Sequence, residues 1–169
     1  MKLNKNELSV LKLLIENSGQ SNVEISEKLG ITPQAVGKIK RKLESSGIIR
    51  GYSADVGLDA VGIKTFAVAL FSYSPELSIR EREEDLNKSI KKPNIIAFCR
   101  IPEGDVTHIV MYGFRDLNEL ENYFQRRQEE RGFKSSLKRL YIFSSRGLLK
   151  NSVRDMLLDI LSSPVSLSA

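Results

Sequence analysis

Apolar residues recur at helical spacing through the first third of the chain. Leu8, Leu11 and Leu14 lie three residues apart, and two further apolar stripes follow within residues 25–29 and 36–43. This spacing is typical of short helices that bury one face. The pattern therefore predicts three helices of about 14, 8 and 13 residues.

Cap signals mark the ends of these three helices. Asn4 and Ser21 are each followed three residues later by Glu, as in a capping box, and Thr32 directly precedes Pro33. A glycine that could form a left-handed C-cap follows each stripe, at Gly19, Gly30 and Gly47. The second and third helices, joined by a three-residue turn, predict a helix-turn-helix at about residues 21–45.

The periodicity changes near residues 57–62, which predicts a second module. From residue 64 the pattern predicts strand, helix, strand, strand, helix and strand at residues 64–73, 79–91, 95–101, 106–113, 116–129 and 137–145. This βαββαβ order is that of ferredoxin-like domains. Residues 48–55, around Gly51, resemble the short ribbon of a wing. We therefore predict an α+β protein with a winged helix-turn-helix domain, a ferredoxin-like domain, and a C-terminal helix and tail, at residues 1–62, 63–148 and 149–169.

The predicted strands carry apolar residues on both faces. In the first strand, Phe66 and Val68 alternate with Ala67 and Ala69. The helices of a ferredoxin-like domain cover only one face, so we expect the sheet of a second subunit to cover the other. A sheet left exposed is the alternative, although soluble monomers rarely expose large apolar patches. Helical spacing at residues 153–161 predicts an amphipathic helix that docks on the protein or its partner.

Composition narrows the classes of function. The net charge of +5 over 169 residues suits an anionic partner. One cysteine and one histidine argue against a disulfide framework, a metal site and most catalytic constellations. The apolar runs are too short to span a membrane, and no signal-peptide cleavage site follows the N-terminus. We expect a cytoplasmic protein with no membrane segment, metal or cofactor, and not an enzyme.

Positive charge is concentrated on the second helix of the predicted helix-turn-helix and the segment after it. Residues 33–50 contain five cations and one acid, Glu44. In a helix-turn-helix this helix enters the major groove of DNA with its first residues on base edges. Gln34 and Lys38, one turn apart, are therefore expected to read bases, with Gln preferring adenine and Lys preferring guanine. The alternative is an ordinary solvated helix face.

The other candidate residues are expected to contact the DNA around these two. Arg41 would read a base or hold a phosphate, and Lys42 would hold a phosphate. Arg50, in the wing, would reach the DNA backbone or the minor groove. Glycine is unfavourable inside a helix, and close approach to DNA would explain Gly37. The hydroxyl groups expected to bind phosphate oxygens belong to Ser21 and Thr32.

Residues 22–36 and 43–52 resemble the N-terminal domain of the Lrp/AsnC family of transcription regulators. The βαββαβ order is similar to that of the dimerising, ligand-sensing domain of the same family, so the resemblance covers residues 3 to about 150. It implies a homodimer formed through facing sheets, which in this family is often assembled further into tetramers or octamers. It also implies binding to pseudo-palindromic double-stranded DNA and, in some members, a response to an amino acid.

The resemblance also suggests where a small-molecule effector would bind. The family pocket lies near a Gly-x-x-Asp turn, and the corresponding residues here are Gly104, Asp105, Val106 and Thr107. Threonine replaces the carboxylate that would suit the ammonium group of an amino acid. The candidate effector residues are therefore Gly104, Asp105 and Thr107, and a plain hairpin turn is the alternative.

Three hypotheses compete with DNA binding. If Ile101 pairs with Val106 across the hairpin, Cys99 lies opposite His108, which is the smallest unit for thiol catalysis or metal binding. Siroheme decarboxylases share the two-domain architecture, but they use histidines and a Trp-containing segment, and this chain has one His and no Trp. The third hypothesis is a partner subunit that does not bind DNA, against which the cationic helix argues.

Overall fold

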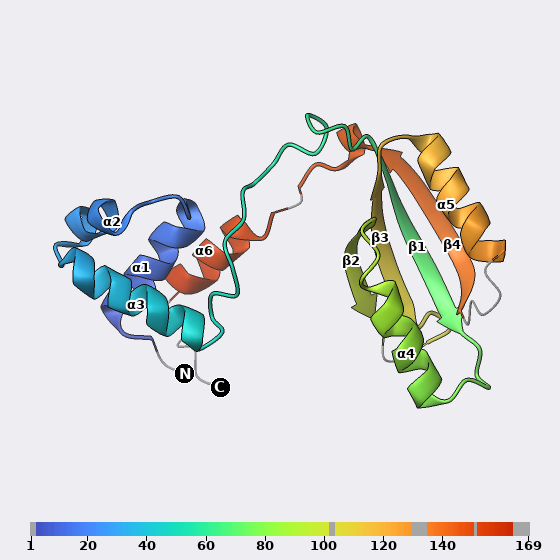
Figure 1. The fold of residues 1–169 in the computed structure, drawn as a ribbon, viewed down its shortest axis with the longest axis horizontal. Helices are drawn as coiled ribbons and strands as arrows, with labels where there is room; N and C mark the ends of the chain where they lie inside the picture. The colour runs from blue at the N-terminus through green and yellow to red at the C-terminus, as the bar shows by residue number, and fades with distance from the viewer. Residues whose placement is uncertain (1–2, 102–103, 130–134, 151, 164–169) are drawn as a thin grey trace. The chain divides into compact units, whose positions relative to one another are not determined.

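The computed structural model describes residues 3–101, 104–129, 135–150 and 152–163, and Figure 1 shows its helices and strands. The chain forms two compact units, of which one comprises Met1–Asp55 with Lys150–Ala169 and the other Val56–Leu149. The units divide earlier than the expected boundary at residue 62, and the C-terminal segment belongs to the first unit. None of the helices in the described residues combines the length and the apolar character of a membrane-spanning segment.

The three helices predicted in the first unit are present. They are α1 (Lys5–Glu16), α2 (Asn22–Leu29) and α3 (Pro33–Ser45). Asn4 and Ser21 form the predicted capping boxes, and the Thr32 hydroxyl accepts the Ala35 N–H at 3.1 Å. These caps bind backbone N–H groups that have no partner inside the helix, which fixes where each helix begins.

Two of the three predicted C-cap glycines have the left-handed conformation. Gly30 has φ 65° and Gly47 has φ 73°. The prediction for Gly19 is wrong, because α1 already ends at Glu16 and the next residue, Asn17, is extended with φ −154°. The Asn17 side chain accepts the Gly19 N–H at 2.9 Å, and this Asx turn closes the helix without a left-handed residue.

The helices of the first unit pack around a small apolar core. Val10, Leu14, Ile25 and Val36 form one buried cluster, and Leu43 is fully buried. Each such side chain contributes about 1.5–3 kcal/mol when it leaves water. The core therefore holds α3 by one face and leaves its opposite face to solvent.

The C-terminal helix confirms the expectation that the tail docks on the protein. Helix α6 (Arg154–Ser162) packs against α1. The segment predicted as a wing, residues 48–55, is different from a ribbon: in the described chain, no residue between Ser45 and Thr65 belongs to a strand. An isolated pair of strands is marginal in water, and here the segment is held by contacts with α3 instead.

The second unit has the predicted ferredoxin-like order. Its strands are β1 (Thr65–Tyr73), β2 (Ile95–Arg100), β3 (His108–Phe114) and β4 (Ser135–Ser144), and its helices are α4 (Ile79–Ser89) and α5 (Leu117–Glu129). The strands form one antiparallel sheet in the order β2-β3-β1-β4, and a 3-10 turn, η1 (Ser145–Gly147), follows β4.

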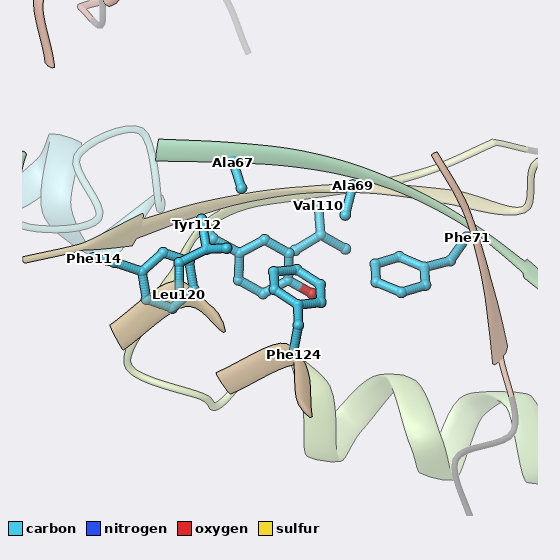
Figure 2. Packing of buried hydrophobic residues seen from close by; sticks show 8 residues of the cluster. All are labelled: Ala67, Ala69, Phe71, Val110, Tyr112, Phe114, Leu120 and Phe124. Atoms are coloured by element: carbon cyan, nitrogen blue, oxygen red, sulfur yellow. The ribbon is translucent and has the colours of Figure 1, made fainter. Parts of the chain in front are cut away.

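One face of this sheet is covered by the helices. Phe71, Tyr112 and Phe114 point to the side on which α4 and α5 lie (Figure 2), and Leu120 and Phe124 of α5 complete the cluster. The alternate residues of the central strands point to the opposite face, which neither α4 nor α5 covers. We name this the open face; it includes Val68, Leu70, Ile109 and Met111, all partly exposed.

The pairing of Cys99 with His108 predicted from the hairpin is wrong. Cys99 is opposite Ile109, and His108 is opposite Arg100. The N–H of Ile101 donates to Thr107 O at 2.9 Å rather than pairing with Val106, which shifts the register by one residue. Cys99 is exposed on the open face and His108 is buried on the other, so the two cannot act together.

Candidate nucleic-acid interface

Helix α3 separates a buried face from a polar one. Val36 and Leu43 are fully buried. Since successive residues turn by about 100°, Gln34, Lys38 and Arg41 lie on the opposite face, and all three are exposed. In the part of the chain that the structure describes, none of these three side chains has a hydrogen bond or an ion pair. We name them the α3 stripe; their polar groups are free to bind a ligand.

The start of α3 places this stripe. Gly30 turns the chain after α2, and the Thr32 cap with Pro33 at the first position starts α3, so that Gln34 lies in its first turn. The hydroxyls of Ser21 and Thr32 accept backbone N–H groups at 3.2 and 3.1 Å. Both residues are exposed, and each hydroxyl still has its O–H to donate to an anionic oxygen.

Lys42 is set apart from the α3 stripe by an ion pair. Its Nζ lies 2.5 Å from Oε1 of Glu7 in α1, whose side chain is only 5% exposed. The Lys42 hydrogen bond, together with the Asn4 N–H, lowers the pKa of Glu7. Lys42 therefore joins α3 to α1, and the phosphate contact expected from the sequence would have to compete with this ion pair.

Gly37 lies on α3, as expected, and packs closely against α2. A Cβ atom on this residue would lie 3.2 Å from Nδ2 of Asn22 in α2. The missing side chain thus leaves room for α2 beside α3. Close packing within the helix-turn-helix is one physical reason for glycine here, and the close approach of Gly37 to DNA stays a prediction.

The segment after α3 makes a group of contacts that were not predicted from the sequence. The Tyr52 hydroxyl donates to Oε1 of Glu44 at 2.8 Å, and Nζ of Lys40 lies 5.5 Å from the centre of the Tyr52 ring. Burial and then Glu44 raise the pKa of Tyr52 to about 12, so the hydroxyl stays a donor at neutral pH. The i,i+4 spacing of Lys40 and Glu44 was the one signal in the sequence. Arg50, in the same segment, is exposed and has no side-chain partner among the described residues.

The candidate effector residues belong to the second unit. Residues 102 and 103 of the predicted turn lie outside the described residues, while Gly104 has φ 112° and Asp105 is exposed. The Thr107 hydroxyl accepts the Tyr73 N–H at 3.0 Å and lies 3.3 Å from Phe71 O and 3.0 Å from Nδ1 of His108. Thr107 is thus engaged in joining β1 to β3.

Known proteins resemble this chain along most of its length. Residues 3–50 match a family model described as winged helix-turn-helix DNA-binding. Transcriptional regulator AzlB of Bacillus subtilis is 32% identical over 123 residues, which cover 72% of this chain and 76% of that protein. HTH-type transcriptional regulator LrpB of the same organism is 30% identical over 110 residues, covering 65% and 70%.

Solved structures share the fold of the whole chain. A transcriptional regulator from Neisseria meningitidis, in complex with L-Met, has a TM-score of 0.75 at 20% identity and covers 90% of this chain and 95% of its own. An AsnC family transcriptional regulator from Agrobacterium tumefaciens has a TM-score of 0.75 at 17% identity, covering 89% and 94%. At these identities the structures support the two-part architecture, and the curated relatives support the kind of activity.

Proposed function

Because the chain belongs to the Lrp/AsnC family of DNA-binding transcription regulators, we propose that it binds a specific pseudo-palindromic site on double-stranded DNA as a dimer. The observation that carries the proposal is the α3 stripe: Gln34, Lys38 and Arg41 project from the second helix of a helix-turn-helix without protein partners among the described residues. Helices of this kind place their N-terminal residues on base edges in the major groove.

Each residue of the interface has a role that its position supports. Gln34 and Lys38 read bases, since Gln can bond adenine at two points and Lys can bond guanine. Arg41, a turn later, reads a base or holds a phosphate. The groups that bind the DNA backbone around the groove belong to Ser21, Thr32 and Arg50.

The open face of the sheet supports the dimer. Val68, Ile109 and Met111 lie on it, and Tyr141 of β4 is 51% exposed. Burial against a second copy would remove this apolar surface from water. A two-fold dimer then presents two α3 helices at a spacing of roughly 34 Å or a multiple of it, as two half-sites of DNA require. Tetramers or octamers built from such dimers, in the cytoplasm where the DNA lies, belong to the same proposal.

The geometry does not favour an amino-acid ammonium group at Thr107. Its hydroxyl is used within the sheet, and no carboxylate stands at that position. Among the candidate effector residues, only Asp105 carries a carboxylate, and it is exposed. A regulator is also favoured over an enzyme, because the matched relatives carry the names of transcription regulators.

Selection of binding sites from random duplex DNA tests the proposal. We expect enrichment of a site with two-fold symmetry. Lys38→Ala and Gln34→Ala should each relax the preference at particular base pairs, because a good base contact is worth about 1–3 kcal/mol of discrimination. Lys88→Ala, an equal loss of charge at an exposed position of α4, is the matched control for Lys38→Ala.

Two outcomes would contradict the proposal in different ways. Equal loss of affinity for every sequence in the α3 variants would remove their base-reading role. If no sequence is enriched at all, the partner-subunit and enzyme alternatives return, and the Soret band of a protein-bound tetrapyrrole would favour the enzyme.

A further inference from the structure

A tyrosine lies between the one acid and one of the five cations of residues 33–50. Lys40 and Glu44 are four residues apart on α3, a spacing at which the two side chains commonly pair directly. Here Tyr52 contacts both side chains: its hydroxyl donates a hydrogen bond to Glu44 at 2.8 Å, and the centre of its ring lies 5.5 Å from the Lys40 ammonium. The ring and the hydroxyl thus attach Tyr52 to the flank of α3 through two independent contacts.

Tyr52 is one of two anchors on either side of Arg50. Before Arg50, the chain turns at Gly47, and the Ile49 N–H donates to Leu43 O at 3.0 Å while the Ile49 side chain packs against the core. After Arg50, the next anchor is Tyr52. The backbone at Arg50 is therefore held at both ends along α3, whereas its side chain extends into solvent.

We propose that Tyr52 is a positioning residue that holds Arg50 beside α3, within reach of a DNA phosphate when α3 lies in the major groove. The inference rests on the proposed DNA binding and adds a residue that touches no DNA itself. A segment that is ordered before binding loses less conformational entropy when it binds. Without Tyr52 the segment keeps its cation but loses the fixed position that lets the cation replace a counterion on the phosphate.

The salt dependence of DNA affinity measures this coupling. Fluorescence anisotropy with a duplex that carries the selected site gives the slope of log K against log salt, which falls by about 0.9 for each phosphate that the protein no longer neutralises. We expect Arg50→Ala to lower the slope by this amount for each phosphate that Arg50 binds. Tyr52→Ala, which removes no charge, should lower it equally, and the double variant should show no further decrease.

Two further variants make the result specific. Tyr52→Phe keeps the ring beside Lys40 and removes only the bond to Glu44, so it should lose a smaller part of the slope than Tyr52→Ala. Thermal unfolding will show whether Tyr52→Ala folds. If it does not, Tyr52→Phe serves as the test of the inference. Lys88→Ala, on the second unit, controls for a general loss of charge.

The outcomes separate the inference from the function on which it rests. The positioning role is overturned if Tyr52→Ala keeps the wild-type salt slope, or if the slope of the double variant is lower than that of Arg50→Ala. If Arg50→Ala keeps the wild-type salt slope, Arg50 binds no phosphate, and the inference is refuted. In each of these cases base discrimination by Gln34 and Lys38 can persist, and its loss alone speaks against the proposed function.

Discussion

Replacement of the single histidine should change how the stability of the ferredoxin-like unit depends on pH. His108 is 2% exposed, and its ring lies 5.1, 4.8 and 5.0 Å from the rings of Phe71, Tyr73 and Phe98. Burial, followed by the charge of Arg127 on α5, lowers its pKa from 6.5 to about 4, while Asp85 on α4 acts in the opposite direction. The folded protein therefore keeps this ring neutral at a pH where the unfolded chain protonates it.

The sign and size of the effect follow from this difference in proton binding. Between about pH 6.5 and pH 4 the unfolded state binds the extra proton, so the free energy of unfolding falls as the pH falls. From pH 7.5 to pH 5 the loss amounts to about 2 kcal/mol for this group, and solvent screening reduces it to between about 1 and 2 kcal/mol. His108→Gln, which has no titrating ring, should lose its stability less steeply over the same interval.

Urea unfolding at fixed protein concentration measures the difference. Four of the five tyrosines lie in the second unit, at 73, 112, 123 and 141, so near-ultraviolet circular dichroism of tyrosine follows that unit. The variant is expected to be less stable than wild type at pH 7.5, because a packed ring is removed, and to approach wild type at pH 5. A constant difference in the free energy of unfolding at both pH values would refute the reasoning.

Three further predictions test the contacts described above. Lys42→Ala should lower the melting temperature of the first unit, because it leaves the Glu7 carboxylate without its ammonium partner. The salt slope of DNA binding should stay unchanged in this variant. A decrease of about 0.9 in the slope would show that Lys42 does contact a phosphate. Leu161→Asp should weaken the docking of α6 on α1 and lower the melting temperature measured from the loss of helical signal. Ile160→Asp, at a position that is 49% exposed, should not lower it. Equal effects of the two substitutions would contradict this orientation of α6. Light scattering should show that wild type is a dimer and that Met111→Asp is a monomer of 19.0 kDa. Asn122→Asp, at an exposed position of α5, is the control and should stay a dimer. A monomeric wild type would refute the proposed dimer.

Features set by neighbouring residues could be predicted from the sequence. The caps at Asn4, Ser21 and Thr32 depend on bonds within three residues, and all three are present in the structure. The βαββαβ order follows equally from local periodicity. The exposed face of α3 was also predictable, because the buried positions of a helix define the opposite side.

Features set by residues far apart in the sequence could not be predicted from it. Glu7 and Lys42 are 35 residues apart, and nothing in either segment predicts that a solvent-facing lysine turns back to a buried carboxylate. The register of Cys99 depended on one hydrogen bond at the hairpin, and a shift of one residue moves a side chain to the other face of a sheet. Gly37 is unfavourable within its own helix, and its close contact with Asn22 could not be predicted from the sequence.

These long-range contacts change what the basic composition of α3 means for DNA binding. Of the five cations in residues 33–50, Lys42 is paired with Glu7 and Lys40 lies over the Tyr52 ring. The cations left without partners among the described residues are Lys38, Arg41 and Arg50. At about 0.9 per phosphate contact, each subunit then contributes at most about 2.7 to the salt slope from this region, against about 4.5 if all five bound phosphates. A measured contribution near the higher value would mean that DNA displaces the internal contacts of Lys40 and Lys42.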